Sequence, residues 1–261
     1  MDLQLEGKTA LVLGAGGGLG AAIARGLASE GAQVAVCDIA GDAAQRTVED
    51  IKGMGGRAMA LTWDLAAIEI IDAQVTSIES ALGQIDILIN NTGGPPPTPA
   101  AGQSLALWRR HFESMVLSVI AVTDRILPGM RARGWGRVIT STSSGVIAPI
   151  PNLGLSNTLR ASLVGWSKTL AREVGRDGIT SNIVVPGSIM TDRLRFINED
   201  TARREGRTPE DVLRESVATI PAARYGRPEE YADVVTFLAS PRAGYVTGSV
   251  IRIDGGMIAN V

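Results

Sequence analysis

Short runs of β-branched and other apolar residues alternate along this chain with longer segments of helical periodicity, and this alternation limits the possible folds more than any other feature. In the longer segments, apolar residues recur at steps of three and four, as Leu155, Leu159 and Leu163 do. Repeated strand–helix–strand units predict an α/β, doubly wound fold with a mostly seven-stranded parallel sheet. The predicted strands are Thr9–Leu13, Gln33–Cys37, Arg57–Thr62, Ile85–Ile89, Gly136–Ser141, Thr180–Val185 and Val250–Ile253.

The chain has no composition break, long linker, internal repeat or low-complexity tail, so we expect a single domain over residues 1–261. The segment Gly93–Pro99 contains four prolines, which predicts a stiff loop rather than a linker. No apolar run reaches the length of a membrane span, and the first residues lack the features of a secretory signal. We therefore expect a cytoplasmic protein with no membrane partner.

Charge and cysteine content exclude further classes of function. The 25 basic residues nearly balance the 27 acidic ones, giving a net charge of −2 and no reason to expect nucleic acid as a partner. Cys37 is the one cysteine, so neither an internal disulfide nor a cluster of thiolate metal ligands can form. We expect no metal site.

A glycine-rich turn, Gly14-Ala15-Gly16-Gly17-Gly18-Leu19-Gly20, directly follows the first predicted strand and opens a helical run. A pyrophosphate needs close backbone approach and free N–H groups at a helix start, and residues without a Cβ allow that approach. The strand–glycine–helix context favours a dinucleotide site over an ordinary tight turn.

Asp38 stands at the end of the second predicted strand, 24 positions after Gly14. A carboxylate there accepts hydrogen bonds from an adenosine ribose and repels a 2′-phosphate. Because the glycine turn contains no arginine to offset that repulsion, NAD is predicted in preference to NADP. The alternative is an ordinary aspartate at a strand end.

Further motifs follow in order: Asp64-Leu65, Asn90-Asn91-Thr92-Gly93, Gly136-Arg137-Val138, Pro186-Gly187-Ser188-Ile189-Met190-Thr191 and Asp254-Gly255-Gly256. With the glycine turn, they make the chain resemble the short-chain dehydrogenase/reductase family over essentially its whole length. The resemblance implies a Rossmann-type fold and hydride transfer between a nicotinamide and a carbonyl or alcohol.

The resemblance also implies which residues hold the cofactor. Asp64 and Leu65 would lie beside the adenine, and Ile189 and Thr191 would hold the nicotinamide carboxamide. Backbone atoms of Asn91–Gly93 would line the ribose, where Thr92 adds a hydroxyl in place of the family's usual Ala. The implied set is Gly14, Gly18, Leu19, Gly20, Asp38, Asp64, Leu65, Asn91, Thr92, Gly93, Ile189 and Thr191.

The proton-transfer residues of the family are replaced at three of four positions. The family uses a Tyr, a Lys four residues later, a Ser after the preceding strand and an Asn in the preceding helix. Alignment on the flanking motifs keeps the Ser as Ser143. It places Ser156 at the Tyr position, Arg160 at the Lys position and Met115 at the Asn position.

These replacements change the available chemistry. A serine hydroxyl is far less acidic than a phenol, and a guanidinium stays protonated at ordinary pH. Ser156 and Arg160 are nevertheless one helical turn apart, so they could converge with Ser143 to orient a substrate oxygen and supply positive charge. The proton would then travel through water or a substrate group. The alternative is degeneration after loss of selection on catalysis.

Other candidate acids and bases are few. Tyr225, Tyr231 and Tyr245 all lie in the carboxy-terminal part and are predicted as core or interface residues. His111, the one histidine, precedes Met115 by four positions, and a surface or interface role is favoured over catalysis.

The substrate side is predicted from two stiff apolar loops, Val146–Pro151 and Pro95–Pro99, which favour a small-molecule substrate of partly apolar character. The highly charged segment near 192–220 resembles the family's substrate lid. Because its charges nearly cancel, a solvated helical face is favoured over a funnel for charged substrates. The family resemblance also implies a homo-oligomer, commonly a tetramer, formed through helices over Leu105–Met130 and Leu155–Val174 and through the last strand.

The hypothesis is an NAD-preferring oxidoreductase with Ser143, Ser156 and Arg160 as an atypical catalytic set. One alternative is a non-catalytic dinucleotide-binding protein with a regulatory or structural role. Another is a lyase or isomerase on the same fold, because fold alone does not settle the reaction.

Overall fold

A computed structural model describes residues 2–260. Seven strands form one sheet in the order β3-β2-β1-β4-β5-β6-β7, and every neighbouring pair is parallel. The predicted doubly wound α/β fold is confirmed, and no strand boundary differs from its prediction by more than two residues. The strands are β1 Thr9–Leu13, β2 Gln33–Asp38, β3 Ala58–Thr62, β4 Ile87–Asn90, β5 Gly136–Ser141, β6 Ile179–Pro186 and β7 Val250–Ile253.

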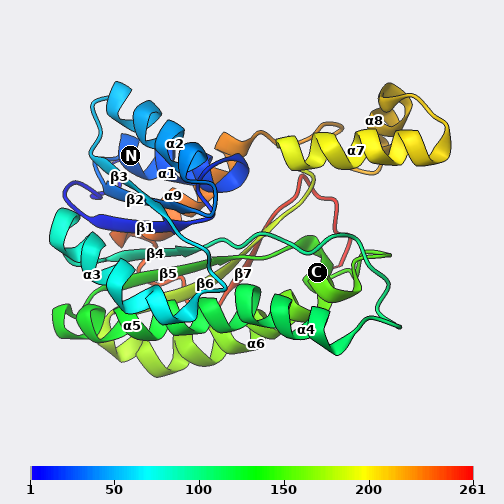
Figure 1. Ribbon diagram of the computed structural model, residues 1–261. Helices are drawn as coiled ribbons and strands as arrows, with labels where there is room; N and C mark the ends of the chain where they lie inside the picture. Colours follow the sequence, from blue (N-terminus) through cyan, green and yellow to red (C-terminus); the bar gives the residue numbers. More distant parts are fainter. Residues whose placement is uncertain (1, 261) are drawn as a thin grey trace.

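Helices cover both faces of the sheet (Figure 1). One face carries α1 Gly18–Ser29, α2 Gly41–Gly53 and α9 Pro228–Ala239; the other carries α3 Ile71–Leu82, α4 Leu105–Phe112, α5 Ser118–Arg133 and α6 Gly154–Val174. Single 3₁₀ turns lie at Ile68–Ile70, Ser144–Val146, Gly175–Asp177 and Pro241–Ala243. Burial on both faces explains why β1 and β5 have no exposed position.

One predicted helix departs from regular geometry. The expected helix over Leu105–Met130 is divided into α4 and α5 by a π-helical turn, Glu113–Leu117. Met115 and Val116 lie in this turn and pack against Leu159 and Leu163 of α6. A π-turn shifts the helical phase by only one residue, so apolar periodicity did not reveal it.

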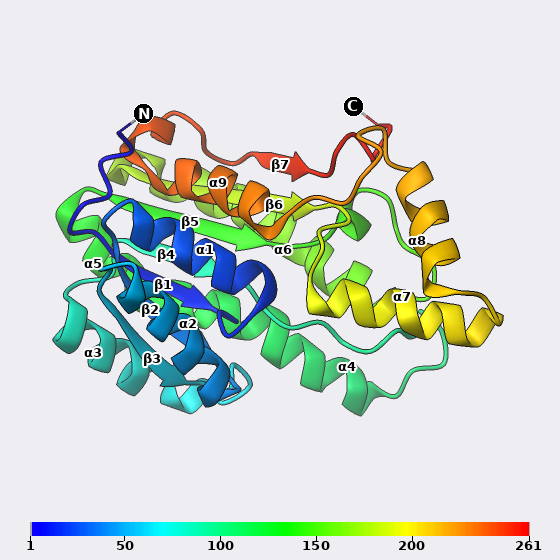
Figure 2. The ribbon, with the colours of Figure 1, turned by 90° about the horizontal axis from the view of Figure 1, so that it is seen from above.

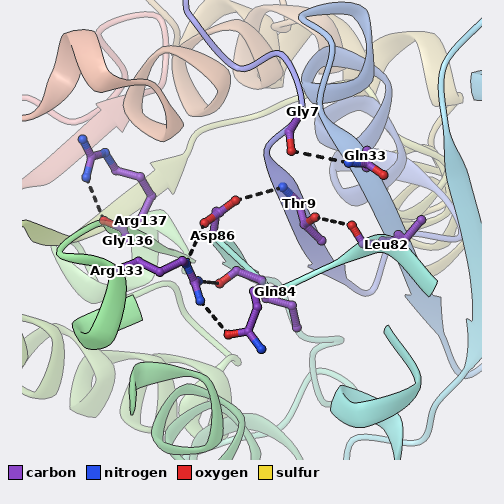
Figure 3. A network of polar contacts seen from close by, with 10 residues as sticks. Gly7, Thr9, Gln33, Leu82, Gln84, Asp86, Arg133, Gly136 and Arg137 are labelled. Carbon is purple, nitrogen blue, oxygen red and sulfur yellow. Dashed lines mark hydrogen bonds and ion pairs between the residues drawn. The ribbon is translucent and has the colours of Figure 1, made fainter. Parts of the chain in front are cut away.

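Side chains tie together the amino ends of the central strands (Figure 3). Asp86 accepts a hydrogen bond from the Thr9 backbone N–H and forms an ion pair with Arg133. The Arg133 guanidinium also donates to Gln84 and to the Ile85 carbonyl at 2.7 Å each. These contacts hold together the amino-terminal ends of the strands, which lie opposite the glycine turn.

Beyond the carboxyl ends of the strands lie α7 Asp192–Glu205 and α8 Pro209–Ala218, which project from the body of the protein (Figures 1 and 2). Thr191 caps α7 and Thr208 caps α8, each accepting a backbone N–H three residues on. None of the helices in residues 2–260 is long and apolar enough to cross a membrane.

Candidate active site

The glycine turn lies at the carboxyl end of β1, where the strand order reverses between β1 and its neighbour β4. In open parallel sheets this reversal leaves a crevice at the strand ends, and ligands bind there. Gly14 has φ +57°, and a Cβ on it would lie 2.6 Å from the Asn91 carbonyl oxygen. The Asn91 side-chain amide donates to the Gly14 carbonyl at 3.0 Å. Glycine is therefore required where the β1 and β4 exits meet.

Asp38 lies against the same turn. Its carboxylate accepts the backbone N–H groups of Gly16 and Ala40, each at 2.9 Å. Its carbonyl accepts the Trp63 N–H at 2.9 Å, which brings the β3 exit and Asp64 alongside. Leu65 packs partly buried on the apolar cluster beneath. These bonds orient the Asp38 carboxylate while each oxygen keeps a lone pair for a ligand hydroxyl.

Two further predicted residues reach this edge from β6. A Cβ on Gly18 would lie 3.5 Å from the Thr191 methyl, so the start of α7 packs on the glycine turn. Ile189 is buried and forms an isolated parallel bridge with Gly226. The structure therefore brings the glycine turn, Asp38, Asn91 and the 189–191 segment together at the carboxyl ends of the strands.

Arg160 is buried on α6, and its guanidinium is directed at backbone carbonyls. It donates to Thr92 and Gly93 at 3.1 Å each and to Ser141 at 3.4 Å. No carboxylate in residues 2–260 pairs with it. Burial, and next the positive charge of Arg193, lower the Arg160 pKa to about 10, so the group stays cationic at neutral pH. Arg160 thus joins the β4 and β5 exits.

Ser143 and Ser156 differ from Arg160 in that their hydroxyl protons have no acceptor within residues 2–260. Ser143 accepts the Gly145 N–H at 3.2 Å. Ser156 is buried and forms no side-chain hydrogen bond in the described part of the chain. The 3₁₀ turn after Ser143 packs on the α6 turn that carries Ser156, because Asn157 of α6 lies against Gly145.

The remaining acid–base candidates do not contact these serines through any hydrogen bond in residues 2–260. His111 is buried, its Nε2 has no partner among the described residues, and burial followed by Arg110 lowers its pKa. Tyr231 is in the core, as predicted, and its hydroxyl bonds Ser141 at 2.8 Å. Tyr225 is also buried, whereas Tyr245 is fully exposed, so Tyr245 is not a core residue and its predicted interface role stays a prediction.

The sequence reasoning missed two polar residues at this edge. Asn157 donates to the Ile150 carbonyl at 2.9 Å and so ties the loop after β5 to α6. Arg193 reaches from α7 to the loop after β4. Asn157 directly follows Ser156, but nothing in the pattern distinguished it. Arg193 was hidden among the other arginines of its segment.

The predicted loop Pro95–Pro99 is joined to the residues that directly follow the other predicted loop, Val146–Pro151. Thr98 donates its N–H to Asn152 at 2.8 Å and accepts the Gly154 N–H at 2.9 Å, forming an isolated parallel bridge. Among residues 2–260, no group of three or more potential metal ligands gathers here or elsewhere.

Fold and site together define a doubly wound α/β protein whose glycine turn lies where the strand order reverses. A family model described as enoyl-(acyl carrier protein) reductase matches residues 14–258. The chain is 36% identical over 258 residues to the 3-oxoacyl-(acyl-carrier-protein) reductase FabG of Escherichia coli, covering 98% of this chain and 99% of that protein.

Two solved structures are similar throughout. L-sorbose reductase from Gluconobacter frateurii, complexed with NADPH and L-sorbose, has a TM-score of 0.95 and 33% identity, with 100% of both chains covered. A 7α-hydroxysteroid dehydrogenase complexed with NADH and 7-oxo glycochenodeoxycholic acid has a TM-score of 0.89 and 32% identity, covering 99% of this chain and 97% of that one. The chain belongs to the short-chain dehydrogenase/reductase family, a family of oxidoreductases.

Proposed function

We propose that this protein transfers hydride between a nicotinamide dinucleotide, preferentially NAD(H), and a carbonyl or alcohol substrate. The observation that carries the proposal is the meeting of the glycine turn, Asp38 and Asn91 at one sheet edge, with backbone contacts too close for any Cβ at Gly14. That arrangement fits a pyrophosphate and a ribose. When bound, the dinucleotide supplies or accepts the hydride.

The residues of this chain fit such a cofactor in several places. N–H groups at the start of α1, from Gly18 to Gly20, would face the pyrophosphate, and the Asp38 carboxylate would accept the adenosine ribose hydroxyls. Thr92 has a buried hydroxyl with no partner in residues 2–260, which a ligand hydroxyl could satisfy. Asp64 and Leu65 would lie beside the adenine. Ile189 and Thr191 would hold the carboxamide.

Asp38 supports NAD over NADP. The solved relatives hold NADPH in one case and NADH in the other, so family membership leaves the choice open. In this chain, both carboxylate oxygens are held by backbone N–H groups, which keeps the negative charge beside the ribose position. A 2′-phosphate there would meet that charge.

On the substrate side, Ser143 and Ser156 would donate hydrogen bonds to the reacting oxygen, because neither hydroxyl proton has an acceptor within residues 2–260. Arg160 would act at short range through its charge, which stabilises an oxygen that becomes negative as hydride arrives. Its positive charge is not neutralised by a carboxylate in residues 2–260. Neither serine is acidic enough to give up a proton permanently, so water or a substrate group would supply it.

The segment 192–220, comprising α7 and α8, would act as a lid over the substrate. Its placement beyond the strand ends supports this role (Figure 2). A homo-oligomer and a cytoplasmic location remain predictions from the sequence.

The proposal is tested by titrating the protein with NADH and NADPH and by screening hydride transfer over carbonyls and alcohols. We expect tighter binding of NADH and turnover of at least one carbonyl class. We also expect Ser156→Ala to lower kcat without changing the dissociation constant for NADH. No binding of either dinucleotide would overturn the proposal.

A second candidate is a non-catalytic dinucleotide-binding protein. It is favoured by one observation: the Arg160 guanidinium is committed to three backbone carbonyls, as a structural residue would be. This candidate predicts tight NADH binding, no turnover of any substrate and no effect of Ser156→Ala on the biological activity.

A further inference from the structure

The segment 192–220 contains six arginines, and one of them differs from the rest. Five form ion pairs with carboxylates of the same segment: Arg195 with Asp192, Arg203 and Arg204 with Asp200, Arg207 with Glu205 and Glu215, and Arg214 with Asp211. Arg193 has no carboxylate partner within residues 2–260. Arg193 is therefore the one arginine of this segment without an ion pair in residues 2–260, whereas Glu199 and Glu210 are its carboxylates without one.

Arg193 is directed at the loop that leaves β4. Its Nη2 lies 3.5 Å from the Pro95 carbonyl, the limit of a hydrogen bond. A Cβ on Gly94 would lie 3.0 Å from the same nitrogen, so the guanidinium rests directly on this glycine. Residues 98 positions apart are thus in contact at the mouth of the site.

Arg160 donates to the backbone carbonyls of Thr92 and Gly93, the two residues immediately before Gly94. Two guanidinium groups therefore flank one four-residue stretch of backbone. Burial lowers the pKa of Arg160, and the positive charge of Arg193 lowers it further. Like charges brought together without an acid destabilise each other, and an anion beside them relieves that repulsion.

We propose that Arg193 is a specificity-determining residue that binds an anionic group, a carboxylate or a phosphate ester, on a small carbonyl substrate. The inference deepens the proposed function and rests on it for the identity of the reacting group. The cofactor pyrophosphate does not account for Arg193, because Thr191 faces the glycine turn whereas Arg193 faces the loop after β4.

The test uses matched pairs of compounds that differ in charge. Levulinate is compared with methyl levulinate, and dihydroxyacetone phosphate with dihydroxyacetone, by calorimetric titration into NADH-saturated protein and by kcat/KM for NADH oxidation. We expect one anion to bind about tenfold or more tightly than its neutral partner, a preference that weakens as salt rises. The pair that shows the preference distinguishes carboxylate from phosphate.

Arg193→Gln is the variant, and Arg195→Gln is the control, because Arg195 lies two positions on, is exposed like Arg193 and is paired with Asp192. The anion preference should fall about tenfold in Arg193→Gln and persist in Arg195→Gln. The dissociation constant for NADH should stay the same in both.

Equal binding of anions and neutral partners, or no binding of any anion, would overturn the inference. So would equal losses in the two variants, or a loss of NADH affinity in Arg193→Gln that matches the loss for the anion. The proposed function is tested separately. An anion preference without any hydride transfer would support the Arg193 site and contradict the proposed function. Hydride transfer to neutral ketones alone would support the proposed function and contradict the Arg193 site.

Discussion

The two halves of the candidate site differ in the kind of atoms that form them. The cofactor half comprises the glycine turn, Asp38, Asn91 and the 189–191 segment, and the substrate half comprises Ser143, Ser156 and Arg160. In the cofactor half, backbone atoms meet backbone atoms, as at Gly14 and Asn91, where a Cβ would not fit. In the substrate half, side chains define the site, and the hydroxyls of Ser143 and Ser156 have no acceptor in residues 2–260. A site built from backbone tolerates few substitutions, whereas a site built from side chains can exchange its residues without altering the fold.

Arg160 connects the two halves. It occupies the substrate half, yet its donors hold the carbonyls of Thr92 and Gly93 in the cofactor half. A guanidinium has five donors in a fixed plane and can bond several carbonyls at once, which an ammonium on a longer, flexible stem does less well. The exchange of Lys for Arg that the family alignment implies therefore alters structure as well as charge.

The largest effect should follow from a change in the cofactor half. Gly14→Val places a branched side chain at φ +57° against the Asn91 carbonyl. We expect the dissociation constant for NADH, measured by fluorescence titration, to rise about 100-fold, with a lower melting temperature. Gly53→Ala is the control, because a Cβ there meets nothing within 4 Å. Unchanged NADH binding in Gly14→Val would show that the glycine turn does not hold the dinucleotide.

The connection between the halves should appear in stability. Arg160→Met removes three hydrogen bonds to carbonyls, and we expect the free energy of unfolding in urea to fall by about 2–4 kcal/mol. Ser156→Ala removes no hydrogen bond formed within the described residues and should stay within about 0.5 kcal/mol of wild type. Equal stabilities of the two variants would show that Arg160 does not hold the strand exits together.

Cofactor preference should respond to the charge of Asp38. Asp38→Asn keeps the side-chain shape but removes the negative charge, so we expect the ratio of NADPH to NADH affinity to rise about tenfold. Melting curves serve as the check, because one of the bonds from Gly16 and Ala40 is lost. An unchanged ratio of NADPH to NADH affinity would show that the adenosine ribose does not bind beside Asp38.

The smallest effect concerns His111. Burial lowers its pKa in the folded protein, so the unfolded chain binds more protons once the pH falls below about 6.5, the ordinary value. This contribution to stability is present above that pH and is lost as the pH falls toward the lower folded pKa. The melting temperature of His111→Leu should therefore fall less than that of wild type between neutral and mildly acidic pH. An identical loss would assign the acid sensitivity to other groups.

Much of the fold and of the cofactor half could be predicted, because both leave local patterns. β1, β5 and β7 follow directly from runs of β-branched and apolar residues, and the glycine turn is continuous in the sequence. The π-turn at Glu113–Leu117 and the reach of Arg193 depend on contacts between distant segments. The direction of the Arg160 guanidinium depends on carbonyls from two other strand exits, which no spacing in the chain records.

The most direct test of hydride transfer follows deuterium during a single turnover. The protein is loaded with NADH deuterated on the nicotinamide and mixed with each of a panel of carbonyl compounds. We expect the wild-type protein to transfer deuterium to product, and Ser156→Ala to slow this step about 10- to 100-fold while binding NADH normally. Transfer that is absent from wild type but appears in Ser156→Tyr combined with Arg160→Lys would contradict this expectation.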